Sequence, residues 1–335
     1  MKCTDRTFRR RRNRKRQLRI RIALFFCIVI GVISLSVLLF TSRKIVHAYE
    51  EKVYSQTGYC ATLFADDLCV TKEEVNYEEF YRHDKFHGAL LLNVDTQEVL
   101  YSENANERLF PASTTKLMTA YLGLKYGNLK DMVTVSKEAV DIPSDSSTAG
   151  LKAGDVLSME DLLYSLMLAS GNDSAIVIAE HISETSEAFV KLMNEEAKAL
   201  GASNTNFVNP HGYHDSKHYT TAYDLYLIFN ECLKNETFVE IISSRSRQAI
   251  ITEKSGVARE VTWGQTNQFL NGMRDVPKGV TIVGGKTGNT NAAGSCLVQL
   301  GKDSNGTSYI SIIMGATSMR NLYDNMTFLW MTLSD

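Results

Sequence analysis

The hydrophobic pattern of the chain first becomes strand-like near residue 88. Residues 88–94 and 98–101 are mostly apolar, and a short polar turn separates the two runs. This pattern predicts a β-hairpin. After a break at Pro111, apolar residues occupy every face of a segment that begins at Ser113 and stops at Gly127. We therefore expect a buried helix directly after the hairpin.

Periodic segments continue to the end of the chain. Helices are predicted at residues 160–169, 174–182, 186–200 and 223–234. Strand-like runs follow at 249–252, 260–263, 280–287, 295–300 and 309–314, with a last helix near 323–333. This order predicts an α+β fold, in which an antiparallel sheet is flanked by helices and an all-helical subdomain is inserted between pieces of the sheet.

The N-terminal part of the chain differs in composition from the rest. Residues 1–21 contain eleven Lys and Arg against the single Asp5, whereas the remainder has 25 basic and 37 acidic residues. Residues 22–42 are uncharged and mostly apolar, which is long enough to cross about 30 Å of hydrocarbon. Since basic residues remain on the cytoplasmic side, everything after Arg43 should lie outside the cell. The basic run is thus a topology signal, and no nucleic-acid partner is predicted.

Four regions are expected along the chain. They are a basic cytoplasmic tail (1–21), a transmembrane signal-anchor (22–42), an extracellular stalk (43–80) and a large folded domain (81–335). Val46-His47-Ala48 loosely fits a cleavage site, so cleavage stays open. The length of the apolar run and the intervening Arg43-Lys44 favour an uncleaved, single-pass anchor in the cell membrane.

Six cysteines are too few for a disulfide scaffold in a chain of 335 residues. Cys60 and Cys69 flank an acidic turn in an oxidising compartment, so a small loop disulfide between them is one option. Cys232 and Cys296 lie in apolar runs and are expected in the core.

Three short motifs carry the candidate chemistry. In order, they are Ser113-Thr114-Thr115-Lys116, Ser170-Gly171-Asn172 and Lys286-Thr287-Gly288. A single S-x-x-K match is weak evidence for an active site, because roughly one or two such matches are expected by chance in a chain of this length. The conjunction is informative, since the first motif opens an apolar helix, the second ends another and the third closes a strand-like run. Together they describe the active site of a penicillin-interacting serine acyl enzyme.

The spacing of the first motif predicts a nucleophile and its base. Ser113 and Lys116 are three residues apart, so a helix places both side chains on one face. Burial on an apolar helix lowers the pKa of an ammonium group and can leave a neutral amine to accept the serine proton. The helix N-terminus also favours negative charge developing at Ser113.

The second motif lies in a predicted turn between two helices. Ser170 offers a hydroxyl that can relay a proton between Lys116 and a leaving amine, which would make it catalytic. Asn172 offers an amide that can hold a substrate carbonyl. Asp173 is expected to cap the following helix.

The third motif follows Gly284-Gly285 on an expected edge strand. Gly288 would let an extended substrate lie beside the strand and pair with its backbone. Lys286 and Thr287 would present a cation and a hydroxyl to a substrate carboxylate. All three residues are therefore predicted to bind substrate, and the chemistry needs no metal or cofactor.

Around these motifs the sequence resembles the serine-type D-Ala-D-Ala carboxypeptidases, the low-molecular-mass penicillin-binding proteins of peptidase family S11. The resemblance runs from about 88 to 333 and includes residues 111–120, 209–212, 286–290 and 293–297. It implies a β-lactamase/DD-peptidase-like fold and removal of the terminal D-Ala from peptidoglycan stem peptides through an acyl-enzyme on Ser113. It also implies an oxyanion hole from the backbone N–H groups of Ser113 and Asn289, and covalent inhibition by β-lactam antibiotics.

Two features depart from the family pattern. Many relatives continue into a C-terminal β-sandwich and an amphipathic anchor, and the N-terminal span is expected to replace that anchor. Relatives often carry an arginine after the last sheet strand that helps to dock the substrate carboxylate. Leu322 falls near this position. Arg320 is the nearest candidate and is predicted to bind substrate.

Other functions compete with this interpretation. A class A β-lactamase would need a glutamate-bearing E-x-x-L-N loop after the second motif, which the sequence lacks. A DD-transpeptidase differs from a carboxypeptidase only in the acceptor that reaches the acyl-enzyme. This alternative therefore stays open. His211, His214 and His218 are crowded enough to suggest a metal hydrolase, but they lie in a predicted loop. A catalytically inert β-lactam-binding or wall-binding protein would not need the motif serine and lysines.

Overall fold

The computed structural model describes residues 68–70, 74–75 and 86–333. These residues belong to one compact unit, Asp67–Asp335. The predicted basic tail, the predicted anchor at 22–42 and most of the predicted stalk lie outside the described residues. Within the described ranges, no helix is both long and apolar enough to cross a bilayer.

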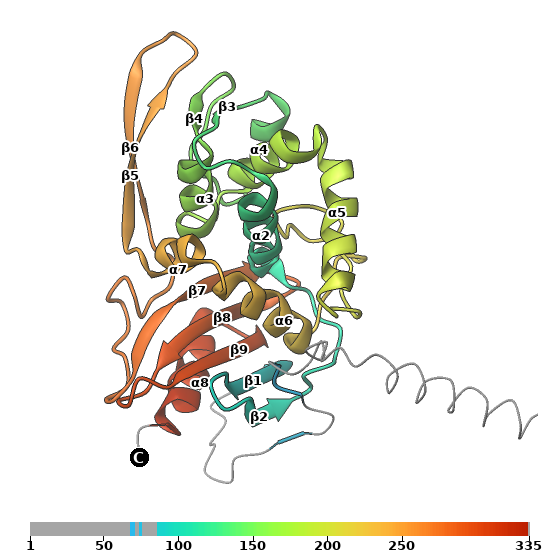
Figure 1. The fold of residues 1–335 in the computed structure, drawn as a ribbon, viewed down its shortest axis with the longest axis vertical. Helices are drawn as coiled ribbons and strands as arrows, with labels where there is room; N and C mark the ends of the chain where they lie inside the picture. Colours follow the sequence, from blue (N-terminus) through green and yellow to red (C-terminus); the bar gives the residue numbers. More distant parts are fainter. Residues whose placement is uncertain (1–67, 71–73, 76–85, 334–335) are drawn as a thin grey trace, which may run out of the picture. The chain divides into compact units, whose positions relative to one another are not determined.

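One part of this unit is a five-stranded antiparallel sheet in the order β2-β1-β9-β8-β7 (Figure 1). Its strands are β1 (Gly88–Asn93), β2 (Glu98–Glu103), β7 (Thr281–Thr290), β8 (Gly294–Lys302) and β9 (Ser308–Ala316). β1 and β2 form the predicted hairpin, and β1 also pairs with β9. Strands from the two ends of the folded segment thus meet in one sheet, and β7 lies at its edge, as the sequence predicts.

Helices cover both faces of the sheet (Figure 1). They are α6 (Ala222–Leu233) and α7 (Glu236–Ser243) on one face, and α8 (Met319–Met331) on the other. Because successive strand residues point to opposite faces, Leu297 and Ile313 pack in the cluster that contains α8. Their neighbours Val298 and Ile312 pack in the larger core with α6 and α7.

The helical block lies between β2 and β7 in the chain. It contains η1 (Ala112–Thr115), α2 (Lys116–Tyr126), α3 (Met159–Leu168), α4 (Asn172–Ser183) and α5 (Ser186–Ala199). α2 is buried along most of its length, as its apolar pattern predicts. Several helices begin at a residue whose side chain accepts a backbone N–H of the first turn, namely Ser158, Thr185 and Thr221.

A second sheet, in the order β3-β4-β5-β6, lies beside the helical block. It consists of β3 (Met132–Thr134), β4 (Val156–Ser158), β5 (Ser246–Thr252) and β6 (Ala258–Gly264), and the short turn η2 (Glu138–Val140) follows β3. β5 and β6 form a long hairpin alongside α3 (Figure 1). The sequence predicts these two strands without separating them from the main sheet, because alternation reveals a strand and not its partner.

The cysteines differ in part from expectation. Cys232 and Cys296 are buried in the core, as predicted. Cys69 is a buried free thiol, so the structure does not contain the disulfide considered above, and Cys60 lies outside the described residues. The backbone N–H of Cys69 donates to Tyr226 Oη at 2.8 Å. This part of the predicted stalk therefore packs against the folded unit.

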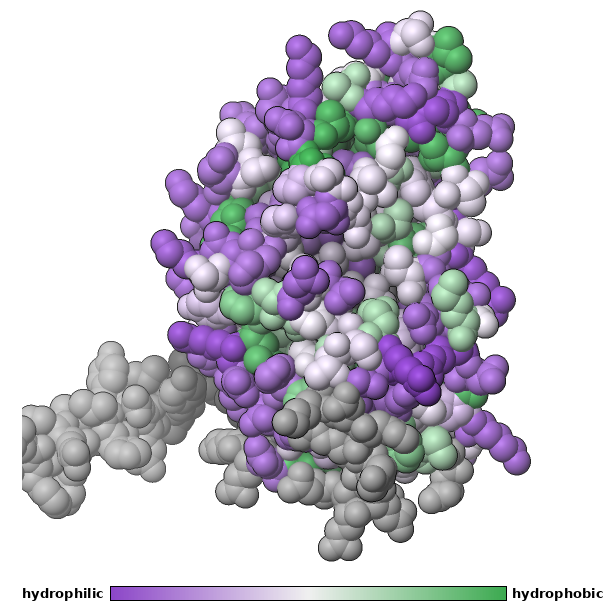
Figure 2. Space-filling view, turned by 180° about the vertical axis from the view of Figure 1, so that it is seen from behind, coloured by the Kyte–Doolittle hydropathy of each residue, from purple (hydrophilic) through white to green (hydrophobic). Residues whose placement is uncertain are grey.

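The architecture confirms the predicted α+β fold, with antiparallel sheets and an inserted helical block. The face shown in Figure 2 is covered mainly by hydrophilic residues, with apolar residues scattered among them. Such scattering is ordinary for a folded domain with an apolar core. We therefore sought the functional site among the buried polar groups.

Candidate active site

Ser113 lies in the 3-10 turn η1, directly before α2, and not at the start of the α-helix that the sequence predicts. A 3-10 turn has about three residues per turn, so side chains at i and i+3 eclipse each other. Ser113 Oγ accordingly lies 3.1 Å from Lys116 Nζ. The turn therefore brings the predicted nucleophile and base into direct contact.

A loop at residues 207–218 holds this turn. Thr115 Oγ1 donates to the Ala112 carbonyl at 2.8 Å and lies 2.9 Å from His218 Nε2. The backbone N–H of Val208 donates to His218 Nδ1 at 3.2 Å, so the neutral ring carries its hydrogen on Nε2 and donates it to Thr115. Ala112 has a φ of 48°, a left-handed conformation that this hydrogen-bond chain stabilises.

Gly212 allows the same loop to touch the turn. Its φ is 86°, and a Cβ placed on it would lie 1.8 Å from the Ala112 carbonyl oxygen. One residue earlier, the carbonyl of His211 accepts a hydrogen bond from Lys116 Nζ at 2.8 Å. The segment 209–212, which carries part of the resemblance, thus supports the turn that presents Ser113.

Lys116 is fully buried, and its Nζ also lies 2.7 Å from Asn172 Oδ1. Burial lowers its pKa well below the ordinary 10.5, and the nearby Lys286 lowers it further. The Asn172 and His211 oxygens can only accept, and a neutral amine has two N–H groups and one lone pair. The lone pair is then left for the hydroxyl of Ser113, as general-base catalysis requires.

Ser170 and Asn172 connect the three motifs. Asn172 Oδ1 faces Lys116, and Ser170 Oγ accepts a hydrogen bond from Lys286 Nζ at 3.0 Å. Ser170 has a φ of 58°, which turns the chain sharply before α4. The sequence predicts a relay from Lys116 through Ser170, but the direct partner of Ser170 in the structure is Lys286.

Asp173 does not cap α4 as predicted, because the helix begins one residue earlier, at Asn172. Its carboxylate accepts the first-turn backbone N–H of Ser174 at 2.9 Å, and also hydrogen bonds from Thr148 Oγ1 at 2.5 Å and from the Ala149 backbone N–H at 2.9 Å. The backbone N–H of Asn172 donates to the Ser147 carbonyl at 2.8 Å. The start of α4 thus fixes the neighbouring segment that follows η2.

The third motif places a second lysine in the same buried cluster. Lys286 is 1% exposed, and its Nζ donates to the Thr287 carbonyl at 2.8 Å as well as to Ser170. Burial lowers the pKa of Lys286 to about 7. Thr287 Oγ1 lies 2.8 Å from Thr266 Oγ1. Sequence reasoning missed Thr266, which belongs to no motif.

Gly288 brings the edge strand against the nucleophile turn. A Cβ at this position would lie 2.9 Å from both the Pro111 carbonyl oxygen and the Ser113 backbone nitrogen. The sequence explains this glycine by substrate access, and the structure adds close packing of β7 on η1. The next residue, Asn289, is therefore near the Ser113 backbone, as the predicted oxyanion hole requires.

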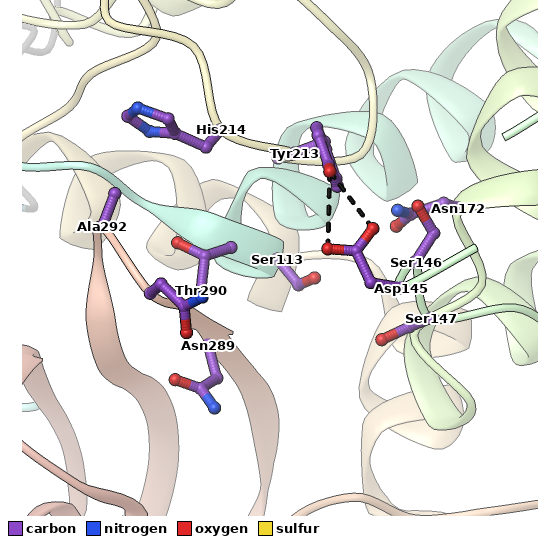
Figure 3. Close-up of a pocket in the computed structure, with 12 residues that line it drawn as sticks. Ser113, Asp145, Ser146, Ser147, Asn172, Tyr213, His214, Asn289, Thr290 and Ala292 are labelled. Carbon is purple, nitrogen blue, oxygen red and sulfur yellow. Dashed lines mark hydrogen bonds between the residues drawn. The ribbon is translucent and has the colours of Figure 1, made fainter. Parts of the chain in front are cut away.

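A pocket of about 480 Å³ opens above Ser113 (Figure 3). Its lining residues are Ser113, Asp145, Ser146, Ser147, Asn172, Gly212, Tyr213, His214, Asn289, Thr290, Asn291 and Ala292. Ser113, Asn172 and Asn289 are sequence-predicted. Lys116, Lys286 and most other motif side chains are buried behind the lining. Asp145, Ser146, Ser147 and Tyr213 belong to no motif and to no segment of the resemblance, so nothing in the sequence pattern singles them out.

Known proteins resemble this chain in sequence. The sequence family described as D-alanyl-D-alanine carboxypeptidase, peptidase S11, matches residues 83–318. The chain belongs to this family. Among its relatives is the D-alanyl-D-alanine carboxypeptidase DacF of Bacillus subtilis, 35% identical over 69% of this chain and 57% of DacF. This S11 chain thus spans little more than half the length of that relative.

Solved structures agree with the family. The Streptomyces K15 DD-transpeptidase is 31% identical to this S11 chain, covers 78% of it and 97% of its own length, and gives a TM-score of 0.68. Penicillin binding protein 5 from Haemophilus influenzae is 29% identical over 78% of this chain and 71% of its own, with a TM-score of 0.64. The fold is therefore that of DD-peptidases.

Arg320 is the one predicted site residue of this S11 chain that the structure leaves away from the pocket. α8 begins at Met319, four residues before the predicted start, so Arg320 falls on its first turn. The Arg320 side chain is 84% exposed, with Nε 3.7 Å from Asp324. Leu322, at the position expected for the family arginine, is fully buried. The structure thus gives no support to substrate docking by Arg320.

The three crowded histidines of the loop have separate environments. Burial is the main cause that lowers the pKa of His211 to about 3 and that of His218 to about 4. His214 makes an edge-to-face contact with Phe110. In the part of the chain that the structure describes, no group of three metal-ligating side chains is arranged to hold an ion.

Proposed function

We propose that the chain is a D-Ala-D-Ala carboxypeptidase that removes the terminal D-Ala of peptidoglycan stem peptides through an acyl-enzyme on Ser113. The observation that carries this proposal is the 3.1 Å contact between Ser113 Oγ and a buried Lys116, at the floor of an open pocket. Family membership supports the same reaction.

In the proposed acylation, Ser113 Oγ attacks the carbonyl carbon between the two D-alanines while Lys116 accepts the hydroxyl proton. Backbone N–H groups of Ser113 and Asn289 stabilise the oxyanion. The C–N bond then breaks, and Lys116 returns the proton to the leaving D-Ala amine. Ser170 contacts Lys286 in the structure, so it would relay this proton only if it reached Lys116 or the amine once substrate is bound. Water attacks the resulting ester, which regenerates Ser113 and releases the shortened peptide.

Substrate binding is assigned to the remaining motif residues. The NH2 group of Asn172 is on the opposite side of its amide from Oδ1, which contacts Lys116, so it is available to a substrate carbonyl. Lys286 and Thr287 would receive the substrate carboxylate through charge and hydrogen bonding. Gly288 and Asn289 would pair with the substrate backbone along the free edge of β7.

The substrate places this reaction outside the cytoplasm. We therefore keep the sequence-based assignments of a cytoplasmic tail, a single-pass anchor in a bacterial membrane and a stalk that connects the anchor to an extracytoplasmic catalytic domain. β-Lactam antibiotics would acylate Ser113 as covalent inhibitors, since they react with the same nucleophile as the peptide.

A DD-transpeptidase is the second candidate, because the Streptomyces K15 structures carry that name. The acyl-enzyme is common to both reactions, and the acceptor decides between water and an amine. A curated relative from the same Streptomyces strain is named a D-alanyl-D-alanine carboxypeptidase. Adding an acceptor amine to the assay below and measuring the ratio of transferred to hydrolysed product separates the two candidates.

The test is release of D-alanine from a peptide ending in D-Ala-D-Ala by the full chain, purified in mild detergent. We expect release by the wild type and none by Ser113→Ala, while Ser147→Ala, which changes another serine of the pocket lining, remains active. Equal release by wild type and Ser113→Ala would refute the assigned nucleophile. No release and no transfer by the wild type would refute the proposed function.

A further inference from the structure

Two side chains meet across the mouth of the pocket. Tyr213 Oη donates to the Asp145 carboxylate, at 3.1 Å from one oxygen and 3.5 Å from the other. Tyr213 belongs to the loop that supports η1, and Asp145 belongs to the segment between η2 and β4. Figure 3 shows the two groups pointing toward each other on the side of the pocket where Ser113 lies. Neither residue belongs to any of the three motifs.

Asp145 gives the pocket its charge. It is the one Asp, Glu, Lys or Arg side chain among the residues that line the pocket. A carboxylate offers about four acceptor positions, and Tyr213 supplies one donor. The mouth of the pocket therefore has spare acceptors and a negative charge.

The segment that carries Asp145 is fixed from behind. The Ser147 carbonyl accepts the backbone N–H of Asn172, and Asp173 holds Thr148 and Ala149. These contacts attach the segment to the start of α4, which also positions the second motif. The Asp145 carboxylate thus has a defined place relative to Ser113.

The direction of β7 indicates which part of the substrate reaches this carboxylate. An extended peptide that pairs antiparallel with β7 places its C-terminal carboxylate near Lys286 and Thr287, and its N-terminal side near Thr290. Thr290 and Asn291 line the same pocket as Asp145. The acyl part of the substrate, which stays on Ser113 after D-Ala leaves, therefore lies in the pocket, with Thr290 on one side and Asp145 on the other (Figure 3).

We propose that Asp145 binds an ammonium group on the acyl part of the substrate. The enzyme would then prefer stem peptides whose residue before D-Ala-D-Ala carries a free side-chain amine. An ammonium donates three hydrogen bonds, and the Asp145 carboxylate has acceptor positions that Tyr213 leaves free. This inference rests on the proposed function and adds a substrate class to it.

The test compares two peptides that differ only in this charge, Nα-acetyl-L-Lys-D-Ala-D-Ala and its Nα,Nε-diacetyl form. For the full-length wild type we expect kcat/KM to favour the free amine by about three- to fivefold, the range of exposed ion pairs. The preference should reside in KM and should shrink as salt screens the charges. Asp145→Asn should abolish it.

The matched control is Asp141→Asn, which removes an exposed carboxylate from the same segment outside the pocket lining. It should keep the wild-type preference. Acylation by benzylpenicillin, which carries no amine, should be unchanged in both variants and reports that each is folded. Equal kcat/KM of the wild type for the two peptides, or an unchanged preference in Asp145→Asn, would overturn the inference alone. Release from neither peptide would overturn the proposed function, and this inference with it.

Discussion

The floor of the pocket and its rim are built in opposite ways. The floor, formed by Ser113, Lys116, Ser170, Asn172 and Lys286, is mostly buried, and hydrogen bonds join its three motifs directly. The rim consists of loop residues around the mouth, where the described side-chain contact across the pocket is the exposed bond from Tyr213 to Asp145.

This difference separates chemistry from recognition. Burial lowers the pKa of both floor lysines, and close packing fixes the distances between their amines and the serine hydroxyls. The floor therefore tolerates little change. Most rim side chains are partly or fully exposed, so apart from Gly212 their identities can vary with little effect on the floor. Substitutions should accordingly have large effects on activity at the floor of the pocket and small effects at the rim.

The largest effect is expected for Lys116→Met, which keeps much of the side-chain length and removes the base. Loss of general-base catalysis should lower kcat for D-Ala release by about 10²–10⁴-fold. The control is Lys125→Met on the same helix, where the lysine is partly exposed and pairs with Glu196. A Lys116→Met enzyme within about tenfold of the wild type would contradict the assigned base, on the same scale of general-base effects.

Gly212→Ala should disturb the floor from outside the motifs. The new Cβ would meet the Ala112 carbonyl oxygen and would also force a side chain into positive φ. We expect about 2–5 kcal/mol of destabilisation from overpacking and strain, with slower acylation of Ser113.

Gly256→Ala provides the matched control, since Gly256 has a φ of 83° and nothing within 4 Å of its Cβ position. Strain alone should cost it about 1 kcal/mol. The measurements are thermal unfolding and the rate of Ser113 acylation in Gly212→Ala and Gly256→Ala. Equal losses of stability and acylation rate in the two variants would show that the contact of Gly212 with the nucleophile turn is unimportant.

Acid should weaken the support of the nucleophile turn through His218. Its pKa is about 4 in the folded protein and near 6.5 when unperturbed. The unfolded state therefore binds more protons between these values, so stability is complete above about pH 6.5 and falls as the pH drops toward 4, by about 3 kcal/mol for this residue. Urea unfolding at pH 7 and pH 4.5 measures the change.

His218→Gln should reduce that pH dependence, because it removes the buried imidazole. An equally steep loss of stability in His218→Gln would assign the acid sensitivity to other groups.

The smallest effect is expected at the rim. Tyr213→Phe removes the hydroxyl that contacts Asp145 and keeps the ring. Because the bond is exposed, unfolding free energy should change by no more than about 0.5 kcal/mol. Hydrolysis of the diacetyl peptide should stay within about threefold of the wild type, the same energetic scale. A loss as large as that of Gly212→Ala would erase the distinction between floor and rim.

The sequence singles out the floor residues because the predicted chemistry needs particular residues at fixed spacings. Ser113 and Lys116 must be neighbours on one turn, and an apolar segment around them predicts the burial that lowers the lysine pKa. The 3-10 geometry of η1 was not predictable, since it depends on Gly212 and His218 about a hundred residues later. Tertiary contacts decided the local conformation there.

Other differences have the same cause. Asp173 has the sequence context of a helix cap, but the loop that packs against it uses its carboxylate. Arg320 is close in sequence to the expected arginine, but the early start of α8 turns it to solvent. Asp145 and Tyr213 are 68 residues apart and meet through folding alone. Sequence patterns indicate which residue types are present, and packing decides which of them meet.

The most direct test of the account is the identity of the acylated residue. The full chain is incubated with benzylpenicillin, digested and analysed by mass spectrometry for the added mass. We predict the adduct on the peptide that contains Ser113, formed in the wild type and in Lys125→Met, and absent from Ser113→Ala. An adduct on another residue, or D-Ala release that proceeds without acylation of Ser113, would contradict the assignment of Ser113 as the nucleophile.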